Sequence, residues 1–252
     1  MKSSGSRANS NTRTVIGLHA SREALKVRPD KITEIWVKNG AERSADLLPF
    51  IDFAKKRRIK LLTKPDGFLD KIASSHQGIC VLVSETPQFD VDDIGSDHTE
   101  KIILLALDEI TDPHNVGAVL RTAWLLGAKA VLVPENRSAH LTPAAIKVAS
   151  GGAEHVPLVN VGNLSHYLTS LKDKGFWVYG LAAEAKSSLW QTKFNERVVL
   201  IVGSEDKGMR STTANVCDEL VSIPQQDSHA SFNASVAASL VLYEVARQHK
   251  NP

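Results

Sequence analysis

From Ile102 onward, short continuous apolar runs alternate with longer segments in which apolar residues recur at helical spacing. The continuous runs predict strands at residues 102–107, 130–134, 176–181, 198–202 and 219–223. Apolar residues three or four positions apart predict helices at residues 115–126, 142–149, 163–174 and 233–248. Short apolar strands that alternate with helices are typical of a parallel sheet covered on both faces. We therefore expect an α/β fold for this part of the chain.

The amino-terminal part carries a smaller pattern of the same kind. Strand-like runs at 32–37 and 78–83 flank a helix-like segment at 44–62. The chain before this pattern is basic, whereas residues 85–100 are acidic and rich in turn-forming residues. We therefore expect four parts, namely a flexible basic tail at 1–14, a small α/β domain at 15–84, a linker at 85–100 and a larger domain at 101–250.

Composition narrows the class of protein. The 252 residues are 42% hydrophobic and 23% charged with a formal net charge of +2, which is ordinary for a globular protein and permits an RNA partner without requiring one. Cys80 and Cys217 are isolated, so neither a disulfide framework nor a zinc cluster is expected. We find no apolar run of about 18 residues and no secretory signal. We expect a soluble cytoplasmic protein with no bound metal and no membrane association.

One expected helix, at 115–126, carries an arginine on its polar side. Asp112-Pro113 is a turn signal, so we expect the helix to begin near Asn115 as its cap and to end at Gly127. The apolar stripe of this helix leaves Arg121 nearly opposite its centre, pointing away from the core. From this helix alone an ordinary solvated arginine is the commoner explanation.

Three loops that follow expected strands carry polar residues. They read DEITDPHN after 102–107, GSEDKGM after 198–202 and PQQDSHASFNAS after 219–223. In parallel sheets, ligands bind beyond the carboxyl ends of the strands, where such loops meet. None matches GxGxxG or GxxxxGK[ST], so a dinucleotide oxidoreductase and a P-loop NTPase lack support.

Single residues in these loops have simple explanations as well as functional ones. Gly203 and Gly208 suit a close backbone approach to a ligand or a tight turn. Glu205 is a lone carboxylate between them, and Asn233 is most simply a helix cap. The basic run Lys55, Lys56, Arg57, Arg58 and Lys60 is either a solvated helix end or an RNA contact.

Taken together, three segments resemble the ordered motifs of the SpoU 2'-O-ribose RNA methyltransferases of the SPOUT superfamily. They are TDPHNVGAVLRTA, LIVGSEDKGM and SIPQQDSHASFNASVAASLVLYE. The segments VIGLHASREAL and SSHQGICVLV resemble the small substrate-binding domain of that family. The resemblance implies a SPOUT-type parallel sheet with a carboxyl-terminal trefoil knot, preceded by a small α/β domain. It also implies a homodimer that uses S-adenosyl-L-methionine as cofactor.

The resemblance assigns functional positions in this chain. Asn115, Arg121, Glu205 and Asn233 match catalytic motif positions, and Gly203, Ile223 and Phe232 match cofactor-binding positions. Arg121 then acts at the RNA end of the site, where its role is most easily defended as a clamp on phosphate and ribose oxygens, because a guanidinium is a poor base. Some mechanisms for the family nevertheless make this arginine the base, so the proton acceptor stays open. The other three catalytic candidates orient the arginine, the ribose and the cofactor loops.

The third motif departs from the family pattern. Relatives commonly read IPMxGxVxSLNVS where this chain reads IPQQDSHASFNAS, and the changed positions include Gln225, Asp227, His229 and Phe232. The function that the resemblance implies most directly is methylation of a guanosine in 23S ribosomal RNA. A transfer-RNA ribose methyltransferase, and a non-catalytic RNA-binding or ribosome-assembly protein with a drifted cofactor site, remain open alternatives.

Overall fold

The computed structural model describes residues 12–73, 75–94, 99–136, 138–227 and 230–250. The chain divides into two compact units, Met1–Thr86 and Pro87–Pro252, and each is described here by itself. Among the described residues, no helix is long and apolar enough to cross a membrane.

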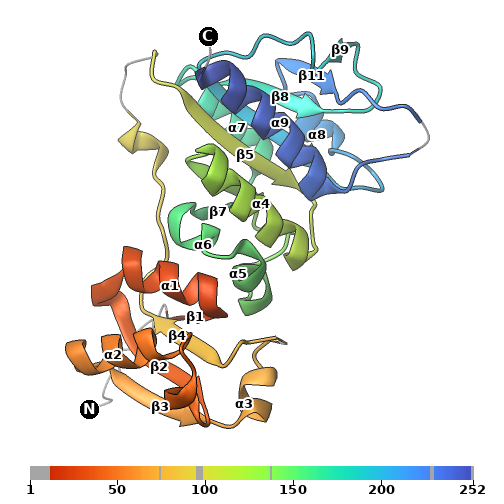
Figure 1. Ribbon diagram of the computed structural model, residues 1–252. Coiled ribbons are helices and arrows are strands. Elements are labelled where there is room, and N and C mark those ends of the chain that lie inside the picture. Colours follow the sequence, from red (N-terminus) through yellow and green to blue (C-terminus); the bar gives the residue numbers. More distant parts are fainter. Residues whose placement is uncertain (1–11, 74, 95–98, 137, 228–229, 251–252) are drawn as a thin grey trace, which may run out of the picture. The chain divides into compact units, whose positions relative to one another are not determined.

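The small unit is an α/β structure built on a four-stranded sheet with the order β1-β4-β2-β3 (Figure 1). Its strands are β1 (Arg13–Ile16), β2 (Ile32–Lys38), β3 (Lys60–Lys64) and β4 (Ile79–Val83). Its α-helices are α1 (Leu18–Val27), α2 (Leu48–Arg57) and α3 (Asp66–Asp70). The β1 strand begins inside the expected tail, and α1 was not predicted.

The helix expected over 44–62 is shorter than predicted at both ends, because α2 begins only at Leu48 and ends at Arg57. Helix α2 stops at Arg57 because Arg58 adopts the left-handed conformation, with φ of 57°, which reverses the chain. The following residues form β3, which pairs in parallel with β2. The basic run is therefore divided between a helix end and a strand, with Lys60 in the strand.

The large unit contains the expected parallel sheet. Seven strands follow the order β7-β6-β5-β10-β8-β11-β9, and every pair is parallel. Their bounds are β5 (Ile102–Asp108), β6 (Ala130–Pro134), β7 (Leu158–Val161), β8 (Trp177–Leu181), β9 (Ser187–Ser188), β10 (Arg197–Gly203) and β11 (Glu219–Ser222). The five predicted strands are confirmed. The two missed strands, β7 and β9, are short and lie at the sheet edges.

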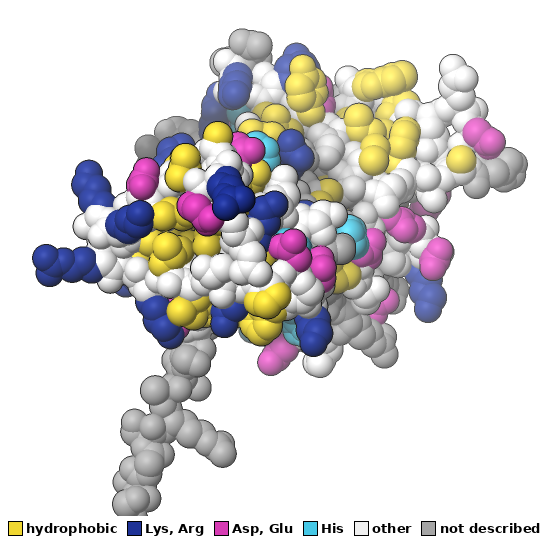
Figure 2. All heavy atoms as spheres, turned by 60° about the horizontal axis from the view of Figure 1, so that its bottom comes forward, with side chains coloured by type: hydrophobic (Ala, Val, Ile, Leu, Met, Phe, Trp, Pro, Cys, Tyr) yellow, Lys and Arg dark blue, Asp and Glu magenta, His cyan; other side chains and the backbone are white. Residues whose placement is uncertain are grey.

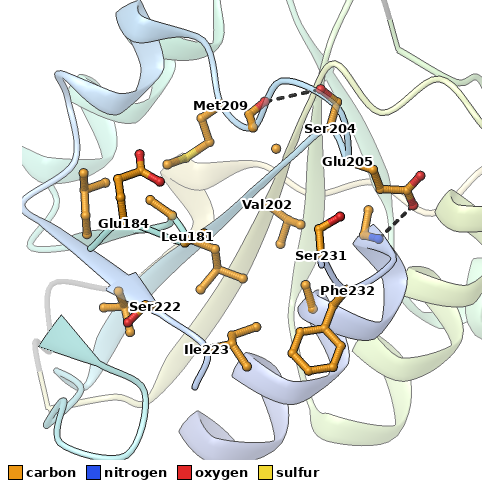
Figure 3. Close-up of a pocket in the computed structure, with 18 of the residues that line it drawn as sticks. Leu181, Glu184, Val202, Ser204, Glu205, Met209, Ser222, Ile223, Ser231 and Phe232 are labelled. Atoms are coloured by element: carbon orange, nitrogen blue, oxygen red, sulfur yellow. Dashed lines mark hydrogen bonds between the residues drawn. The ribbon is translucent and has the colours of Figure 1, made fainter. Parts of the chain in front are cut away.

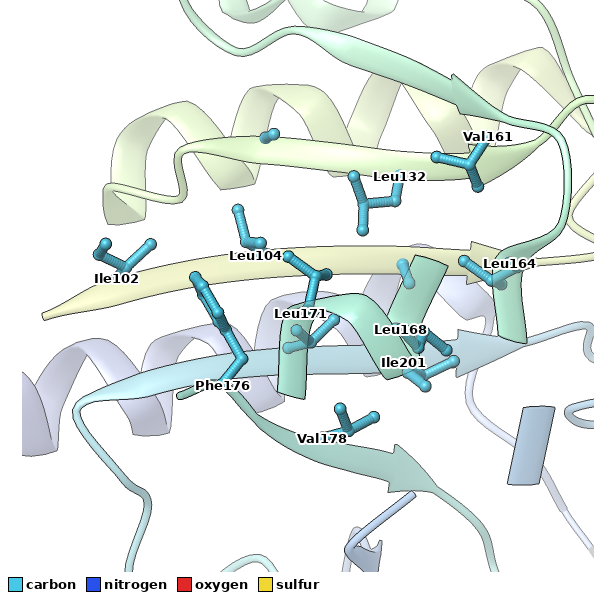
Figure 4. Close-up of a cluster of buried hydrophobic side chains, with 13 residues drawn as sticks. Ile102, Leu104, Leu132, Val161, Leu164, Leu168, Leu171, Phe176, Val178 and Ile201 are labelled. Atoms are coloured by element: carbon cyan, nitrogen blue, oxygen red, sulfur yellow. The ribbon is translucent and has the colours of Figure 1, made fainter. Parts of the chain in front are cut away.

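Helices cover both faces of this sheet. On one face, α4 (Pro113–Leu126) and α9 (Ala234–Lys250) pack side by side (Figure 1), and α5 (Pro143–Ala149) and α6 (Gly152–His155) pack against α4. On the other face lie α7 (Leu164–Lys172) and α8 (Ser211–Ala214). Figure 4 shows Leu164, Leu168 and Leu171 of α7 directed at buried side chains of the central strands. Because the strands are parallel and buried, all their carboxyl ends lie at one edge.

The start of α4 differs from the expectation. The cap is Asp112, whose carboxylate accepts a hydrogen bond from the His114 backbone N–H at 2.8 Å, and Pro113 is the first helical residue. Asn115 therefore lies inside the first turn, and its side chain is free to bond elsewhere. Gly127 ends the helix with φ of 83°, as predicted.

The segment expected as a linker packs partly on the large unit. Phe89, Val91 and Ile94 contact the apolar cluster beneath α7, and residues Val91–Asp93 form a 3-10 helix. Residues 95–98 lie outside the described part of the chain.

Candidate active site

A cavity of about 570 Å³ opens at the carboxyl edge of the large sheet. It is lined by the loops that follow β8, β10 and β11 (Figure 3). Two of these are loops that the sequence indicated. The third expected loop, after β5, does not line the cavity, and the β8 loop from Leu181 to Glu184 takes its place. The rule that ligands bind beyond carboxyl strand ends would also have identified the β8 loop.

The loop after β10 folds into a tight hairpin from Gly203 to Met209. Ser204 and Gly208 exchange two backbone hydrogen bonds, of 3.1 and 2.8 Å. Gly208 has φ of 67°, a conformation that favours glycine. A Cβ at Gly203 would collide with the backbone of Gly208 and Met209. Gly208 thus makes the tight turn that the sequence indicated, whereas the close approach at Gly203 is to the backbone of the hairpin itself and not to a ligand.

Asn115, Glu205 and Asn233 meet at one carboxylate oxygen. The amide groups of Asn115 and Asn233 donate to Glu205 Oε1 at 3.2 and 2.6 Å, and the Ala234 backbone N–H donates to it at 2.9 Å. Figure 3 shows this carboxylate directed at the amino-terminus of α9, where helix N–H groups stabilise negative charge. Asn233 also donates to Asn115 Oδ1 at 3.0 Å. Residues from three separate segments, namely the first turn of α4, the hairpin after β10 and the start of α9, therefore form one network beside the cavity.

Asn233 is a helix cap and a member of this network at once. Its Oδ1 accepts from the Ser235 backbone N–H at 3.0 Å and from the Ser235 hydroxyl at 2.6 Å, which satisfies the first turn of α9. Its Nδ2 remains available for Glu205 and Asn115. The simple explanation and the functional one are therefore compatible.

Arg121 lies exposed on α4, as its helical position indicated. Among the described residues its guanidinium makes no hydrogen bond or ion pair, and it does not contact the Asn115–Glu205–Asn233 network. Helix α6 packs directly against the α4 backbone at this point, because a Cβ at Gly152 of α6 would lie 2.6 Å from the Leu120 carbonyl oxygen. A fixed helix thus presents an unpaired cation to solvent.

The remaining candidates line the cavity. Ile223 and Phe232 approach it from the loop after β11, with Val202 and Leu181 on neighbouring strands (Figure 3). Gln225, one of the departures from the family pattern, donates its amide to the Ala230 carbonyl at 2.6 Å and so bridges its own loop. Asp227 is exposed, and His229 lies outside the described residues.

Two residues near the hairpin were missed. Asp108, the last residue of β5, is completely buried and forms an ion pair of 2.6 Å with Arg210, directly after the hairpin. A charged residue at the end of a continuously apolar strand was a usable signal, since buried carboxylates are normally paired. Its partner could not be read from spacing.

Fold and cavity together define an α/β protein with a cavity of the size of a small organic ligand at the carboxyl edge of a parallel sheet. The chain belongs to the SpoU rRNA Methylase family, whose model matches residues 102–243. Residues 14–89 match a second model, described as RNA 2'-O ribose methyltransferase substrate binding. The family resemblance of the three motifs is thereby confirmed.

Several curated relatives are similar over nearly their whole length. The chain is 38% identical to the 23S rRNA (guanosine-2'-O-)-methyltransferase RlmB of Escherichia coli K12 over 238 residues, which covers 93% of this chain and 98% of that one. It is also 38% identical to RlmB of Photobacterium profundum over 241 residues, or 94% and 98% of the two chains.

Solved structures share the fold. The SpoU methyltransferase AviRb from Streptomyces viridochromogenes, in complex with AdoMet, superposes with a TM-score of 0.82 at 22% identity, covering 97% of this chain and 93% of that one. A structure described as an RNA 2'-O ribose methyltransferase gives a TM-score of 0.78 at 23% identity, covering 97% and 91%.

Proposed function

We propose that this protein transfers a methyl group from S-adenosylmethionine to the ribose 2'-oxygen of a guanosine in 23S ribosomal RNA. The substrate follows from its similarity to the RlmB enzymes. The observation that carries the reaction is the network of Asn115, Glu205 and Asn233 at the rim of the cavity, with an unpaired Arg121 on the same helix as Asn115.

The cavity fits the cofactor. Its volume of about 570 Å³ is typical for a ligand of that size, and Gly203 and Gly208, which have no side chains, are among the residues that line it. Phe232 and Ile223 form an apolar wall suited to an adenine ring, and the Glu184 carboxylate suits a cofactor with net positive charge. When bound, the cofactor supplies an electrophilic methyl group on sulfur.

The chain's own residues have separable tasks in this proposal. Arg121 holds phosphate and ribose oxygens of the RNA, because a free guanidinium binds oxyanions in a fixed geometry. Glu205 fixes the amides of Asn115 and Asn233, so that the loops at the reaction centre keep one arrangement. Such orientation of reactants can supply a large part of a rate enhancement.

The small unit, expected at 15–84, supplies RNA affinity in this account, and residues 101–250 supply the chemistry. Arg57 pairs with Asp30 and Lys60 with Glu34, which leaves Lys55, Lys56 and Arg58 of the basic run for phosphates. Figure 2 shows Lys and Arg side chains spread over this face of the small unit, around a group of hydrophobic ones. We also propose a cytoplasmic location, because ribosomal RNA is the proposed substrate.

Two further properties of the family are proposed for this chain. A homodimer is supported by an exposed apolar stripe on α9, formed by Val236, Leu240 and Tyr243 at successive turns. A trefoil knot is proposed because the chain belongs to the SpoU rRNA Methylase family. Leu240→Lys should convert the dimer to a monomer in analytical ultracentrifugation.

Mapping 2'-O-methyl positions in cellular RNA, with and without the gene, tests the proposed substrate. The proposal requires the loss of one ribose methyl from a guanosine of 23S ribosomal RNA. Loss from a transfer RNA would support the transfer-RNA alternative, and an unchanged map would support a non-catalytic protein.

Calorimetric titration of the purified protein with S-adenosylmethionine tests whether the altered third motif still allows cofactor binding. We expect binding, because Gly203 and the Ile223-Pro224 turn are retained and Phe232 is still apolar. Asp227 is the position most able to obstruct the loop, although aspartate tolerates unusual backbone conformations better than most residues. No binding at millimolar cofactor by a folded protein would contradict the proposal, and restoration by Asp227→Gly would identify the cause.

A further inference from the structure

The hairpin that lines the cofactor cavity is held at both of its ends, but by different kinds of contact. At the Glu205 end, the exposed Glu205 is bonded to Asn115, which is partly buried, and to Asn233, which is exposed to water. At the other end, Arg210 is bonded to Asp108, whose side chain is completely buried. Bonds that compete with water are individually weak, so the buried contact dominates the placement of the hairpin.

The Asp108 carboxylate accepts two hydrogen bonds from Arg210 and forms an ion pair with it. The Arg210 backbone N–H donates to Oδ2 at 2.9 Å and Nε donates to Oδ1 at 2.8 Å, while Nη2 lies 2.6 Å from Oδ1 in the ion pair. These contacts fix the backbone and the side chain of Arg210 together, and charge-assisted hydrogen bonds of this kind are strong. Asp108 is also the register neighbour of Gly203, the residue that begins the hairpin.

One buried carboxylate therefore ties the beginning of the hairpin to its end. We propose that Asp108 is a positioning residue for the cofactor pocket, acting through Arg210 to hold the segment from Gly203 to Met209 in its binding arrangement. The inference rests on the proposed function, because it takes S-adenosylmethionine as the ligand of that cavity. A buried pair is weak support for stability by itself, and its use here is to select one loop conformation.

A matched ion pair in the same unit provides a control. Lys172 and Asp218 also meet at 2.6 Å, and the Lys172 side chain is 35% exposed, compared with 34% for Arg210. Asp218 immediately precedes β11, so this pair lies away from the carboxyl edge of the sheet. Arg210→Met and Lys172→Met thus break comparable pairs, of which only the first adjoins the cavity.

The experiment compares cofactor affinity, kinetic constants and melting temperature in the two variants of the full chain. We expect both to lower the melting temperature, but only Arg210→Met to weaken S-adenosylmethionine binding, on the order of tenfold, and to raise the cofactor KM while the RNA KM is unchanged. Arg210→Lys should recover part of the loss. Equal cofactor affinity in Arg210→Met and Lys172→Met would overturn the inference.

Hydrogen exchange separates this inference from the proposed function. The backbone N–H groups of Ser204 and Gly208 should exchange faster in Arg210→Met than in wild type, and at the wild-type rate in Lys172→Met. This readout needs no cofactor, so it decides the positioning role even if the wild-type protein fails to bind S-adenosylmethionine. Unchanged exchange in Arg210→Met would refute the role. If Arg210→Met does not fold, Asp108→Asn and Arg210→Lys provide the same comparison.

Discussion

Arg121 is the residue on which the proposed chemistry depends most. Its side chain is exposed and makes no hydrogen bond or ion pair with the described residues, so it contributes little to the folded state. Because the Arg121 guanidinium does not stabilise the folded state, it is available to bind an anionic substrate. By contrast, burial raises the pKa of the Cys217 thiol to about 11 and of the Cys80 thiol to about 12, which leaves both as unreactive thiols near neutral pH.

We predict that Arg121→Ala abolishes methyl transfer while it leaves the melting temperature and S-adenosylmethionine affinity nearly unchanged. The reason is that the guanidinium contacts only RNA in this account. Single-turnover rates check the prediction, with Lys129→Ala as a control for loss of an exposed cation in the same unit. A variant that retains more than about a tenth of the wild-type rate, a change of only about 1.4 kcal/mol, would remove Arg121 from the mechanism.

At the scale of elements, the hairpin after β10 is the part of the site whose geometry is most constrained. Its backbone approaches itself so closely at Gly203 that no side chain fits there. The same element contributes Glu205 to the network and six residues to the cavity wall. A small displacement of this hairpin therefore affects the cofactor and the Asn115–Glu205–Asn233 network together.

We predict that Gly203→Ala lowers S-adenosylmethionine affinity by at least about tenfold and destabilises the fold by about 1–3 kcal/mol, because the new methyl group forces the hairpin away. Gly162→Ala is the matched control, since a Cβ at Gly162 meets no atom within 4 Å. Titration calorimetry and thermal unfolding of both variants measure the effects. Wild-type affinity in Gly203→Ala would contradict the close-approach role.

The elements that the sequence predicted well are those with long, regular apolar patterns, such as β5 and α4. The errors arose where a local signal competed with another. Asn115 was taken as a cap although Asp112, three residues earlier, is an equally good cap and precedes a proline suited to the first turn. The edge strand β9 has only two residues, too few for any pattern. Neither the contact of Asp108 with Arg210 nor the convergence of Asn115, Glu205 and Asn233 follows from spacing, because both join distant segments.

At the scale of the whole molecule, the proposed function assigns RNA affinity to the small unit and chemistry to the large unit. The small unit carries Lys55, Lys56 and Arg58 at the end of α2, where their charges also favour the helix dipole. Phosphate contacts release counterions, so their contribution to binding falls with salt. Cofactor binding belongs to the large unit and should not depend on these charges.

We predict that the double variant Lys55→Gln/Lys56→Gln weakens RNA binding and reduces the slope of log affinity against log salt by roughly 1 to 2. Affinity for S-adenosylmethionine should be that of the wild type. Lys26→Gln/Lys71→Gln removes two exposed lysines elsewhere in the same unit and should change the slope less. An unaltered slope in the first variant would mean that the basic run is only a solvated helix end.

Reconstitution of the reaction tests the central claim most directly. The purified full chain is incubated with methyl-labelled S-adenosylmethionine and either 23S ribosomal RNA or transfer RNA, and the methylated position is mapped. The account predicts transfer to the 2'-oxygen of a guanosine in 23S ribosomal RNA, and its absence in Arg121→Ala. Transfer to a base atom, transfer to transfer RNA alone, or no transfer by a protein that binds the cofactor would contradict it.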